Sequence, residues 1–267
     1  MIILLLCSCC AKTQVLHTLF LEAYNSPVAC SRDADATSFL INPAALPQSK
    51  QASVVSYSEQ KFLLKELSGG SVALAFPAAG GGIGIALGVT GYSSYNNAQV
   101  GLAYGRALDK RINLGVQINY HLVHTAGYGN SSAAGFELGC IIHATDQLFA
   151  GIRVSNPLGG RYGRSADDKL PASYTMAVGF EASENLILYM HTKKVENQPV
   201  DILFALQYDF VRQFFVRAGT TTVSNTLFAG VGLGWKNFRL DLIGNYHLRL
   251  GATPALQLVM QFQKGGP

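Results

Sequence analysis

The sequence predicts an all-β fold, namely a transmembrane antiparallel β-barrel of about 14 strands. Three observations lead to this prediction. Charged residues are scarce, segments of about ten residues alternate between apolar and polar side chains, and the links between these segments are short and long in turn. Together these observations describe a protein whose outer surface faces lipid and whose interior is polar.

The composition indicates that water is not the main solvent of the outer surface. Hydrophobic residues make up 49% of the chain and charged residues only 13%, whereas soluble domains have about 25% charged residues. No stretch is typical of a membrane-spanning helix, because the uncharged run between Glu66 and Arg106 is interrupted by Pro77 and by three glycines at 80–82, and it alternates as strands do. The net charge of +4 is scattered, which excludes a nucleic-acid stripe.

Fourteen segments beyond residue 50 alternate with a period of two. Near the end of the chain, for example, Leu240 and Leu242 alternate with Arg239 and Asp241. No helix-length segment lies between the strands to cover their apolar faces, so lipid outside and a polar lumen inside satisfy both faces, and closure of the sheet pairs every backbone group. The predicted strands are 52–60, 68–76, 82–92, 97–107, 112–124, 133–144, 148–156, 172–182, 186–195, 200–210, 214–223, 226–235, 238–248 and 254–263.

The links between the predicted strands differ in length in a regular way. One set is tight, such as LDKR, ATDQ and ASEN, and the other set is longer, such as SEQKFLLKEL and NPLGGRYGRSADDKLP. Outer-membrane barrels have short periplasmic turns and longer surface loops, and an even strand number places both chain ends on the periplasmic rim. A soluble β-sandwich, the alternative, has no reason to keep this asymmetry. We therefore expect the protein in the bacterial outer membrane.

The chain begins with a short apolar stretch, MIILLLCSCCA. This stretch is typical of the core of an export signal, although no basic residues precede it. We expect an atypical or truncated signal peptide over 1–11, a periplasmic or plug segment over 12–50 and the barrel over 51–267. Two alternatives are a lipoprotein signal that leads into Cys9 and an ordinary buried strand.

Two predicted strands nearly lack side chains on their inward faces. The residues concerned are Gly82, Gly84, Ala86, Gly88, Gly230, Gly232 and Gly234. The space beside them admits residues 24–47, with Arg32, Asp33 and Asp35 paired to lumen side chains such as Arg239 or Asp241. The alternative is that these glycines only relieve crowding in a curved sheet.

Polar residues at inward positions are candidates for the lumen wall: Asn113, Gln117, Asn119, His121, Arg239, Asp241, Asn245 and His247. We expect no metal site, because His121 and His124 are three residues apart and point to opposite faces of a strand, and the five cysteines lack a ligand spacing. GGGIGIALG is not a nucleotide fingerprint and no serine motif is present. The sequence therefore predicts neither a cofactor nor an enzyme.

The segment before the first strand resembles a known family. It reads YNSPVACSRDADATSFLINPAAL within 24–47, and SNPLGG at 155–160, LPASYTMAVGF at 170–180 and the final strands continue the likeness. This ordered series, from about residue 24 onward, is similar to the PorV/PorQ family, which is related to FadL-type transporters. The resemblance implies a 14-stranded outer-membrane barrel whose N-terminal segment enters the lumen. It makes Arg32, Asp33, Asp35, Asn42 and Pro43 candidates for a plug or gate.

The resemblance implies two functions that the sequence does not separate. The first is a PorV/PorQ-type barrel that binds or passes cargo at the cell surface as a type IX secretion accessory, with exported proteins or secretion components as partners. The alternative is a FadL-like channel for small hydrophobic compounds, and a third reading is a purely structural barrel. Outer-membrane lipid is a partner in every case.

Two features would distinguish these functions. The longest loop offers charged residues for protein contacts, although it could equally be a solvated loop. A channel predicts an apolar pocket that leads to a wall opening beside residues 24–47, and a sealed, fully polar lumen would count against it. The charged loop residues are Arg161, Arg164, Asp167, Asp168 and Lys169.

Overall fold

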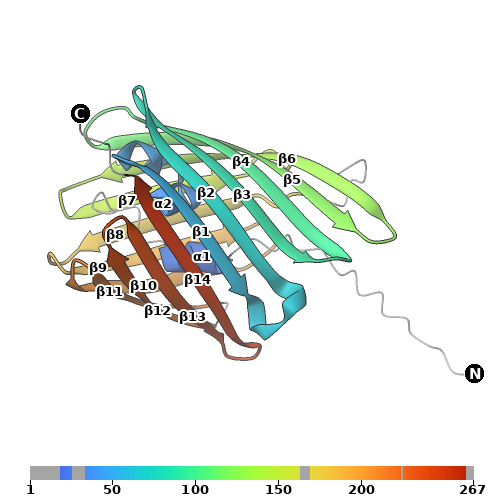
Figure 1. Ribbon diagram of the computed structural model, residues 1–267. Helices are drawn as coiled ribbons and strands as arrows, with labels where there is room; N and C mark the ends of the chain where they lie inside the picture. Colours follow the sequence, from blue (N-terminus) through green and yellow to red (C-terminus); the bar gives the residue numbers. More distant parts are fainter. Residues whose placement is uncertain (1–18, 26–33, 163–168, 224, 263–267) are drawn as a thin grey trace, which may run out of the picture.

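Fourteen antiparallel strands close into one barrel in the computed structural model, which describes residues 19–25, 34–162, 169–223 and 225–262 (Figure 1). Each strand pairs with its neighbours in sequence, and β1 pairs with β14. This confirms the predicted closed all-β barrel. The strands are β1 (Ala52–Gln60), β2 (Ser68–Ala78), β3 (Gly81–Tyr92), β4 (Tyr95–Ala107), β5 (Ile112–Thr125), β6 (Gly129–His143), β7 (Leu148–Ser155), β8 (Ser173–Glu181), β9 (Leu186–Val195), β10 (Val200–Val211), β11 (Phe214–Thr221), β12 (Thr226–Trp235), β13 (Phe238–His247) and β14 (Gly251–Phe262).

The strand boundaries match the predicted ones closely, with two exceptions. β6 begins at Gly129 instead of 133, and β14 begins at Gly251 instead of 254. Both glycines have positive φ, at 90° and 96°, and follow tight turns. From the sequence alone, glycine and serine at these positions indicate a loop. In the structure, Gly129 pairs with Thr125 and Gly251 pairs with His247, which extends both strands.

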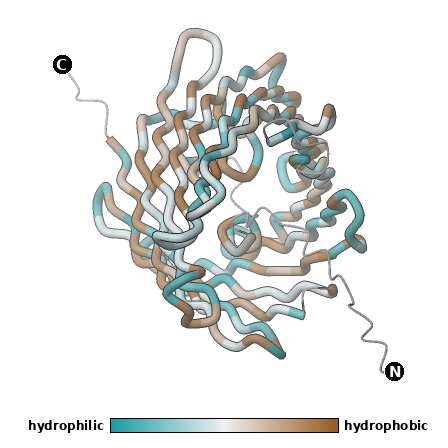
Figure 2. The backbone as a smooth tube through the Cα atoms, turned by 90° about the vertical axis from the view of Figure 1, so that its right-hand side faces the viewer, coloured by the Kyte–Doolittle hydropathy of each residue, from teal (hydrophilic) through white to brown (hydrophobic). Residues whose placement is uncertain are grey.

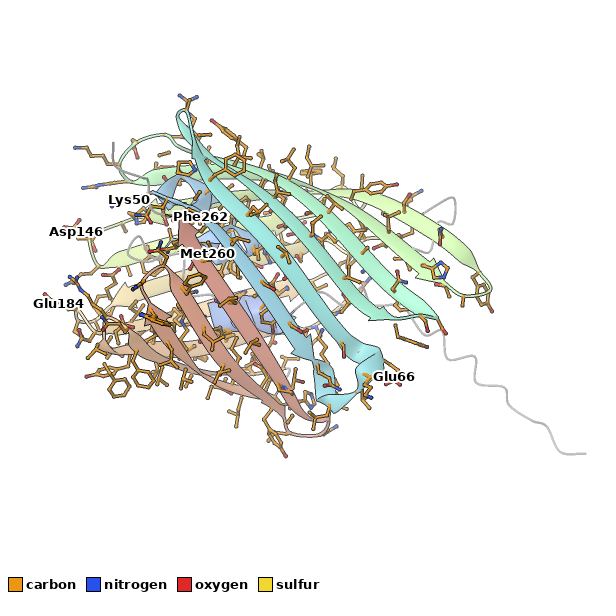
Figure 3. The ribbon with its side chains drawn as sticks, viewed as in Figure 1. Lys50, Glu66, Asp146, Glu184, Met260 and Phe262 are labelled. Carbon is orange, nitrogen blue, oxygen red and sulfur yellow. The ribbon has the colours of Figure 1, made fainter. Side chains whose placement is uncertain are left out.

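The outer wall is apolar along the middle of the barrel. Ile118 on β5 has 65% of its surface exposed, and Leu102 and Phe204 are similarly exposed on β4 and β10. Such side chains alternate with buried polar ones, as lipid outside a polar lumen requires. Figure 3 shows charged residues at the two ends, with Lys50, Asp146 and Glu184 at one end and Glu66 at the other.

An arginine at Ile118 is expected to destabilise the barrel. Ile118 lies midway along β5 and faces lipid, where a charged side chain costs about 2–4 kcal/mol. At the rim the cost is about 0–1 kcal/mol, so Leu108→Arg, in the turn after β4, is the matched control. Urea titrations of folding into lipid vesicles measure both. Equal effects of the two substitutions would contradict a lipid boundary at Ile118.

Residues 19–25 and 34–48 lie inside the ring of strands as three short helices (Figure 2). They are α1 (Leu19–Asn25), α2 (Ala36–Ile41) and the 3-10 helix η2 (Pro43–Gln48). The loop between β1 and β2 contains the 3-10 helices η3 (Lys61–Leu63) and η4 (Lys65–Leu67). None of the described helices is long and apolar enough to cross a membrane. We call residues 19–25 and 34–48 the plug.

Local sequence signals explain the plug helices. Asp35 caps α2 by accepting a hydrogen bond of 2.8 Å from the Thr37 N–H, and the Ser38 hydroxyl accepts one from the Asp35 N–H, which completes a capping box. Asn42 caps η2 by accepting from the Ala44 N–H at 3.0 Å, and Pro43 occupies the first helical position. The NPAAL sequence therefore forms a capped turn, as an Asn-Pro pair predicts.

The lumen wall is only partly polar, which corrects the expectation of a polar interior. Near α2 and η2 the inward residues are apolar and mostly small, including Val55 on β1 and Val259 on β14. This patch packs against Phe39 and Leu46 of the plug, both almost fully buried. The inner wall matches the apolar face of the helices it contacts, because burying these plug side chains against polar groups would leave the groups without partners.

Candidate functional site

The first element of the site is a row of glycines on which the plug rests. We call Gly82, Gly105, Gly115 and Gly139 the glycine row, because each is the direct cross-strand partner of the next across β3, β4, β5 and β6. A Cβ at Gly82 would lie 2.7 Å from the Leu46 carbonyl oxygen, and one at Gly105 would lie 2.6 Å from that of Pro43. At Gly115 and Gly139 it would overlap the Ala44 nitrogen and the Asn42 side-chain oxygen. Glycine is thus required where the plug backbone approaches the wall.

Asn42 fastens the plug to the wall at the end of this row. Its side-chain amide donates to the backbone carbonyls of Cys140 on β6 and Ile152 on β7, at 3.3 and 3.2 Å. Its Oδ1 meanwhile caps η2. One side chain therefore uses both its donors and its acceptor to join the helix to two strands, which identifies a specific docking contact rather than loose filling.

Glu22 forms the second attachment, through charge. Its carboxylate oxygens lie 2.5 Å from Arg153 on β7 and 2.5 Å from Lys193 on β9. Arg153 also donates to the Leu40 carbonyl of α2 at 3.2 Å and lies 3.9 Å from Glu137 on β6. Glu22 and Arg153 are 6% and 5% exposed. Arg153 and Lys193 together hold α1 through Glu22, because a buried carboxylate is stable only when it is paired with cations.

A third attachment joins the plug to β11, β13 and β14. Asp35 pairs with Arg239 at 2.8 Å, which is one of the pairings that the sequence suggested. The Asn25 amide donates to Gln257 at 2.8 Å, and its oxygen accepts from Arg217 at 3.3 Å. Asp35 is the N-cap of α2 and Asn25 is the last residue of α1, so both contacts are made by short polar side chains at helix ends. The plug is therefore held by separate polar contacts on both sides of the lumen.

A small cavity lies beside Glu22, between the plug and β2–β7. Its volume is about 70 Å³, and its lining includes Leu21, Leu40, Asn97 and Arg153. An apolar cavity that holds benzene measures about 150 Å³. With the plug in place, the cavity is thus too small for an aromatic ring.

An apolar cluster occupies the other side of the lumen, around α1. Tyr24 is fully buried and packs with Tyr189, Leu203, Phe228 and Ile243 from β9, β10, β12 and β13. Burial raises the pKa of the Tyr24 hydroxyl well above its usual range, because the ionised form would lose its hydration. The lumen is therefore neither fully polar nor open at this level.

The same strands carry an apolar groove on their membrane face. The groove has a volume of about 730 Å³, and most of its lining residues, such as Phe204, Leu206 and Leu227, are outward-facing. Two lining residues, Tyr189 and Ala205, also belong to the inner apolar cluster. The groove forms where small residues stand between larger ones, and the single sheet of the barrel separates it from the cluster.

The long loop between β7 and β8 does not lie wholly on the surface, which corrects the prediction of a surface feature. Tyr162 and Leu170 are buried against inward-facing Val123 and Ala133 of β5 and β6. Burial raises the pKa of Tyr162 to about 12. The loop turns inward because its apolar residues find partners there. Arg161 is exposed, and Lys169 forms an exposed ion pair of 2.9 Å with Glu196.

Apart from the plug and loop residues described above, the predicted site residues fall into three groups. Those that are buried on the inner wall are Asn113, Gln117, Asn119, His121, Asp241 and Asn245, with Arg239 half-buried beside them. His247 is at the rim instead, where its Nδ1 accepts from the backbone N–H groups of Arg249 and Leu250. Arg32, Asp33, Arg164, Asp167, Asp168 and the expected signal peptide over 1–11 lie outside the described residues.

Sequence reasoning missed Glu22, Tyr24, Arg153 and Lys193. The available signal was a single cation at an inward position of a strand that is otherwise apolar or small, as Arg153 is in LFAGIRVS. Among the described residues, no three His, Cys, Asp or Glu side chains gather closely enough to hold a metal ion.

Comparison with known proteins supports the fold. No protein-family model matches the chain, and no curated protein matches it in sequence. Among solved structures, the CymD monoaromatic hydrocarbon channel has a TM-score of 0.66 and 11% identity, over 91% of this chain and 98% of that one. The toluene transporters TbuX of Ralstonia pickettii and TodX of Pseudomonas putida have TM-scores of 0.60 and 0.61 and identities of 12% and 10%. They cover 88% and 84% of this chain and 96% and 92% of their own. The chain thus shares the fold of these channels, as a closed antiparallel β-barrel of 14 strands.

Proposed function

We propose that this protein is an outer-membrane channel for small hydrophobic molecules, which pass between the membrane and the lumen when the plug shifts. The observation that carries this proposal is the apolar groove on β8–β12, which shares Tyr189 and Ala205 with the apolar cluster inside the barrel. A polar solute gains nothing from either surface, whereas an apolar one is favoured in both. The fold likeness to channels for monoaromatic hydrocarbons supports the same class of solute.

The plug supplies the closed state of this channel. Between the described strands, every neighbouring pair is hydrogen-bonded, so passage through the wall at the groove requires a local separation of strands as well as a shift of the plug. Inside, Tyr24 and Leu21 fill the apolar cluster. Release of the Glu22 and Asn25 contacts would free α1, whereas η2 stays on the glycine row. We propose that α1 is the moving part and η2 the fixed part of the gate.

Filling the groove is expected to slow uptake of an apolar solute. Ala218 faces outward on β11 and lines the groove, so Ala218→Leu occupies it without touching the lumen. Ala98→Leu is the matched control, because Ala98 faces outward on β4, seven strands away in a barrel of fourteen. Uptake of radiolabelled toluene by Gram-negative cells that produce each variant is the measurement. We expect a several-fold reduction for Ala218→Leu alone, and equal rates in the two variants would contradict a route through the groove.

The type IX secretion role that the sequence resemblance implies stays a second candidate. Arg161 is exposed at the surface, as a protein contact requires. Purification from outer membranes in mild detergent, followed by mass spectrometry of copurifying proteins and small molecules, distinguishes the two functions. Secretion components or exported proteins would support the secretion role, and a bound apolar molecule without protein partners would support the channel.

A further inference from the structure

The plug inserts one aromatic ring into a recess in the barrel wall. Tyr24 has no exposed surface, and a Cβ at Gly230 on β12 would lie 2.5 Å from its ring carbon Cε2. Glycine at 230 thus makes room for the ring. Phe228, Arg217 and Gly230 lie against the ring, and Phe215 lies against the Arg217 guanidinium; we call these four residues the tyrosine recess.

The contacts in the tyrosine recess favour an aromatic ring over other apolar groups. Phe228 meets the Tyr24 ring edge to face, with centroids 6.3 Å apart and planes at 76°. The Arg217 guanidinium carbon lies 4.9 Å from the centroid of Tyr24 and 4.6 Å from that of Phe215. A desolvated cation over a ring face adds stabilisation that a saturated ring cannot provide. Arg217 is 1% exposed, so its guanidinium is desolvated.

The recess does not depend on the plug for its shape. Arg217 Nε donates to Gln207 at 2.8 Å, and the Gln207 amide donates to Asp209 at 2.7 Å, all within β10 and β11. When α1 leaves, Arg217 keeps Gln207 and Phe215 and loses only Tyr24 and the 3.3 Å bond to Asn25. A preorganised site binds a ligand more tightly than one that must be ordered first.

The recess also tolerates a small polar substituent on the ring. No hydrogen bond of good geometry reaches the Tyr24 hydroxyl from the described residues, but the charges of Arg217, Arg239 and Asp241 are near enough to influence its pKa. The arginines can donate a hydrogen bond, and the aspartate can accept one, to a hydroxyl on a ligand ring whose position differs slightly from that of the tyrosine hydroxyl. A monoaromatic molecule with a hydroxyl group therefore fits the site as well as the tyrosine side chain does.

We propose that the tyrosine recess is a binding site for a monoaromatic molecule, such as a phenol, and that Tyr24 occupies it as a built-in ligand while the plug is seated. This inference rests on the proposed function, because it supposes that small hydrophobic molecules reach the lumen. Ligand and Tyr24 exclude one another, so a monoaromatic molecule favours the unseated α1 to an extent that rises with its concentration relative to its Kd.

Removal of the Tyr24 ring tests the proposal. p-Cresol has the structure of the tyrosine side chain, so the Tyr24→Ala protein in detergent is expected to bind one p-cresol with a Kd at least tenfold lower than that of the wild type, measured by calorimetry. Tyr24→Phe, which keeps a ring in the recess, should bind like the wild type. The saturated analogue 4-methylcyclohexanol should bind Tyr24→Ala several-fold more weakly than p-cresol does, because Arg217 gains no ring face.

A second variant separates the recess from a general loosening of the plug. Leu21 belongs to the same apolar cluster and is 4% exposed, but it lies outside the recess. Leu21→Ala loosens α1 but keeps the competing Tyr24 ring, so its gain in p-cresol affinity should be several-fold smaller than that of Tyr24→Ala. Equal gains in Leu21→Ala and Tyr24→Ala, or equal affinity for the saturated alcohol, would overturn the proposal. Because binding is measured without transport, a protein that binds p-cresol but admits no toluene into cells would contradict the channel and leave the recess intact.

Discussion

Replacing Glu22 by glutamine is expected to unseat α1. The substitution keeps the size of the side chain but leaves Arg153 and Lys193 facing a neutral group inside the lumen. Removing one partner of a buried ion pair costs about 3–5 kcal/mol. The cost falls on the plugged state, because both cations are hydrated once α1 leaves. The open fraction of channels in planar lipid bilayers should therefore rise by roughly two orders of magnitude or more, since about 1.4 kcal/mol corresponds to a factor of ten.

Glu196→Gln is the matched control for this prediction. Glu196 pairs with Lys169 at 2.9 Å, but at the surface. Hydrogen bonds from Lys169 and from the Ala172 N–H lower the pKa of Glu196, so the contact is real although it is solvated. Exposed pairs of this kind contribute little. Glu196→Gln should leave the open fraction unchanged, and a Glu22→Gln channel that stays equally closed would show that the ion pair does not hold the plug.

Gly115→Ala is expected to have the second large effect. The added Cβ overlaps the backbone of Pro43 and Ala44, which cannot move aside as a flexible side chain can. Either η2 lifts from the wall or β5 distorts, and the extended pairing of β5 with both neighbours favours movement of η2. Bilayer conductance should increase, and the NPAAL segment should become sensitive to added protease.

Gly88→Ala is the control for the glycine row. Gly88 also faces inward, on β3, but a Cβ there would lie 3.9 Å from its nearest neighbours, which is ordinary contact. It tests the addition of a methyl group to the inner wall without a clash. If both substitutions raise conductance equally, the glycine row has no special role in docking.

The sequence was sufficient to predict the barrel because the alternation of apolar and polar residues can be recognised within each strand. The alternation from Ile112 to Thr125 repeats over a whole strand, so β5 was predicted to within one residue. The turn signals between strands are local too. The assignment failed at Gly129 and Gly251, where pairing with the neighbouring strand decides whether glycine belongs to a strand or to a loop.

The plug contacts were less predictable because they depend on register. The glycine row forms only when four strands pair in the correct register, and the sequence of any one of these strands does not indicate it. Asp35 and Arg239 were found because both are charged and flank small-residue stretches. Glu22 was missed because its partners lie 131 and 171 residues away. The apolar cluster around Tyr24 was missed because the general rule for barrels predicts a polar lumen.

The most direct test of the central claim is the rate at which intact Gram-negative cells take up radiolabelled toluene with and without this protein. The account predicts faster uptake in cells that produce it, a further increase with Glu22→Gln, and no difference in the uptake of glycerol between cells with the wild-type protein and cells without it. Equal toluene uptake in the presence and absence of the protein would contradict a role as a channel for small hydrophobic molecules.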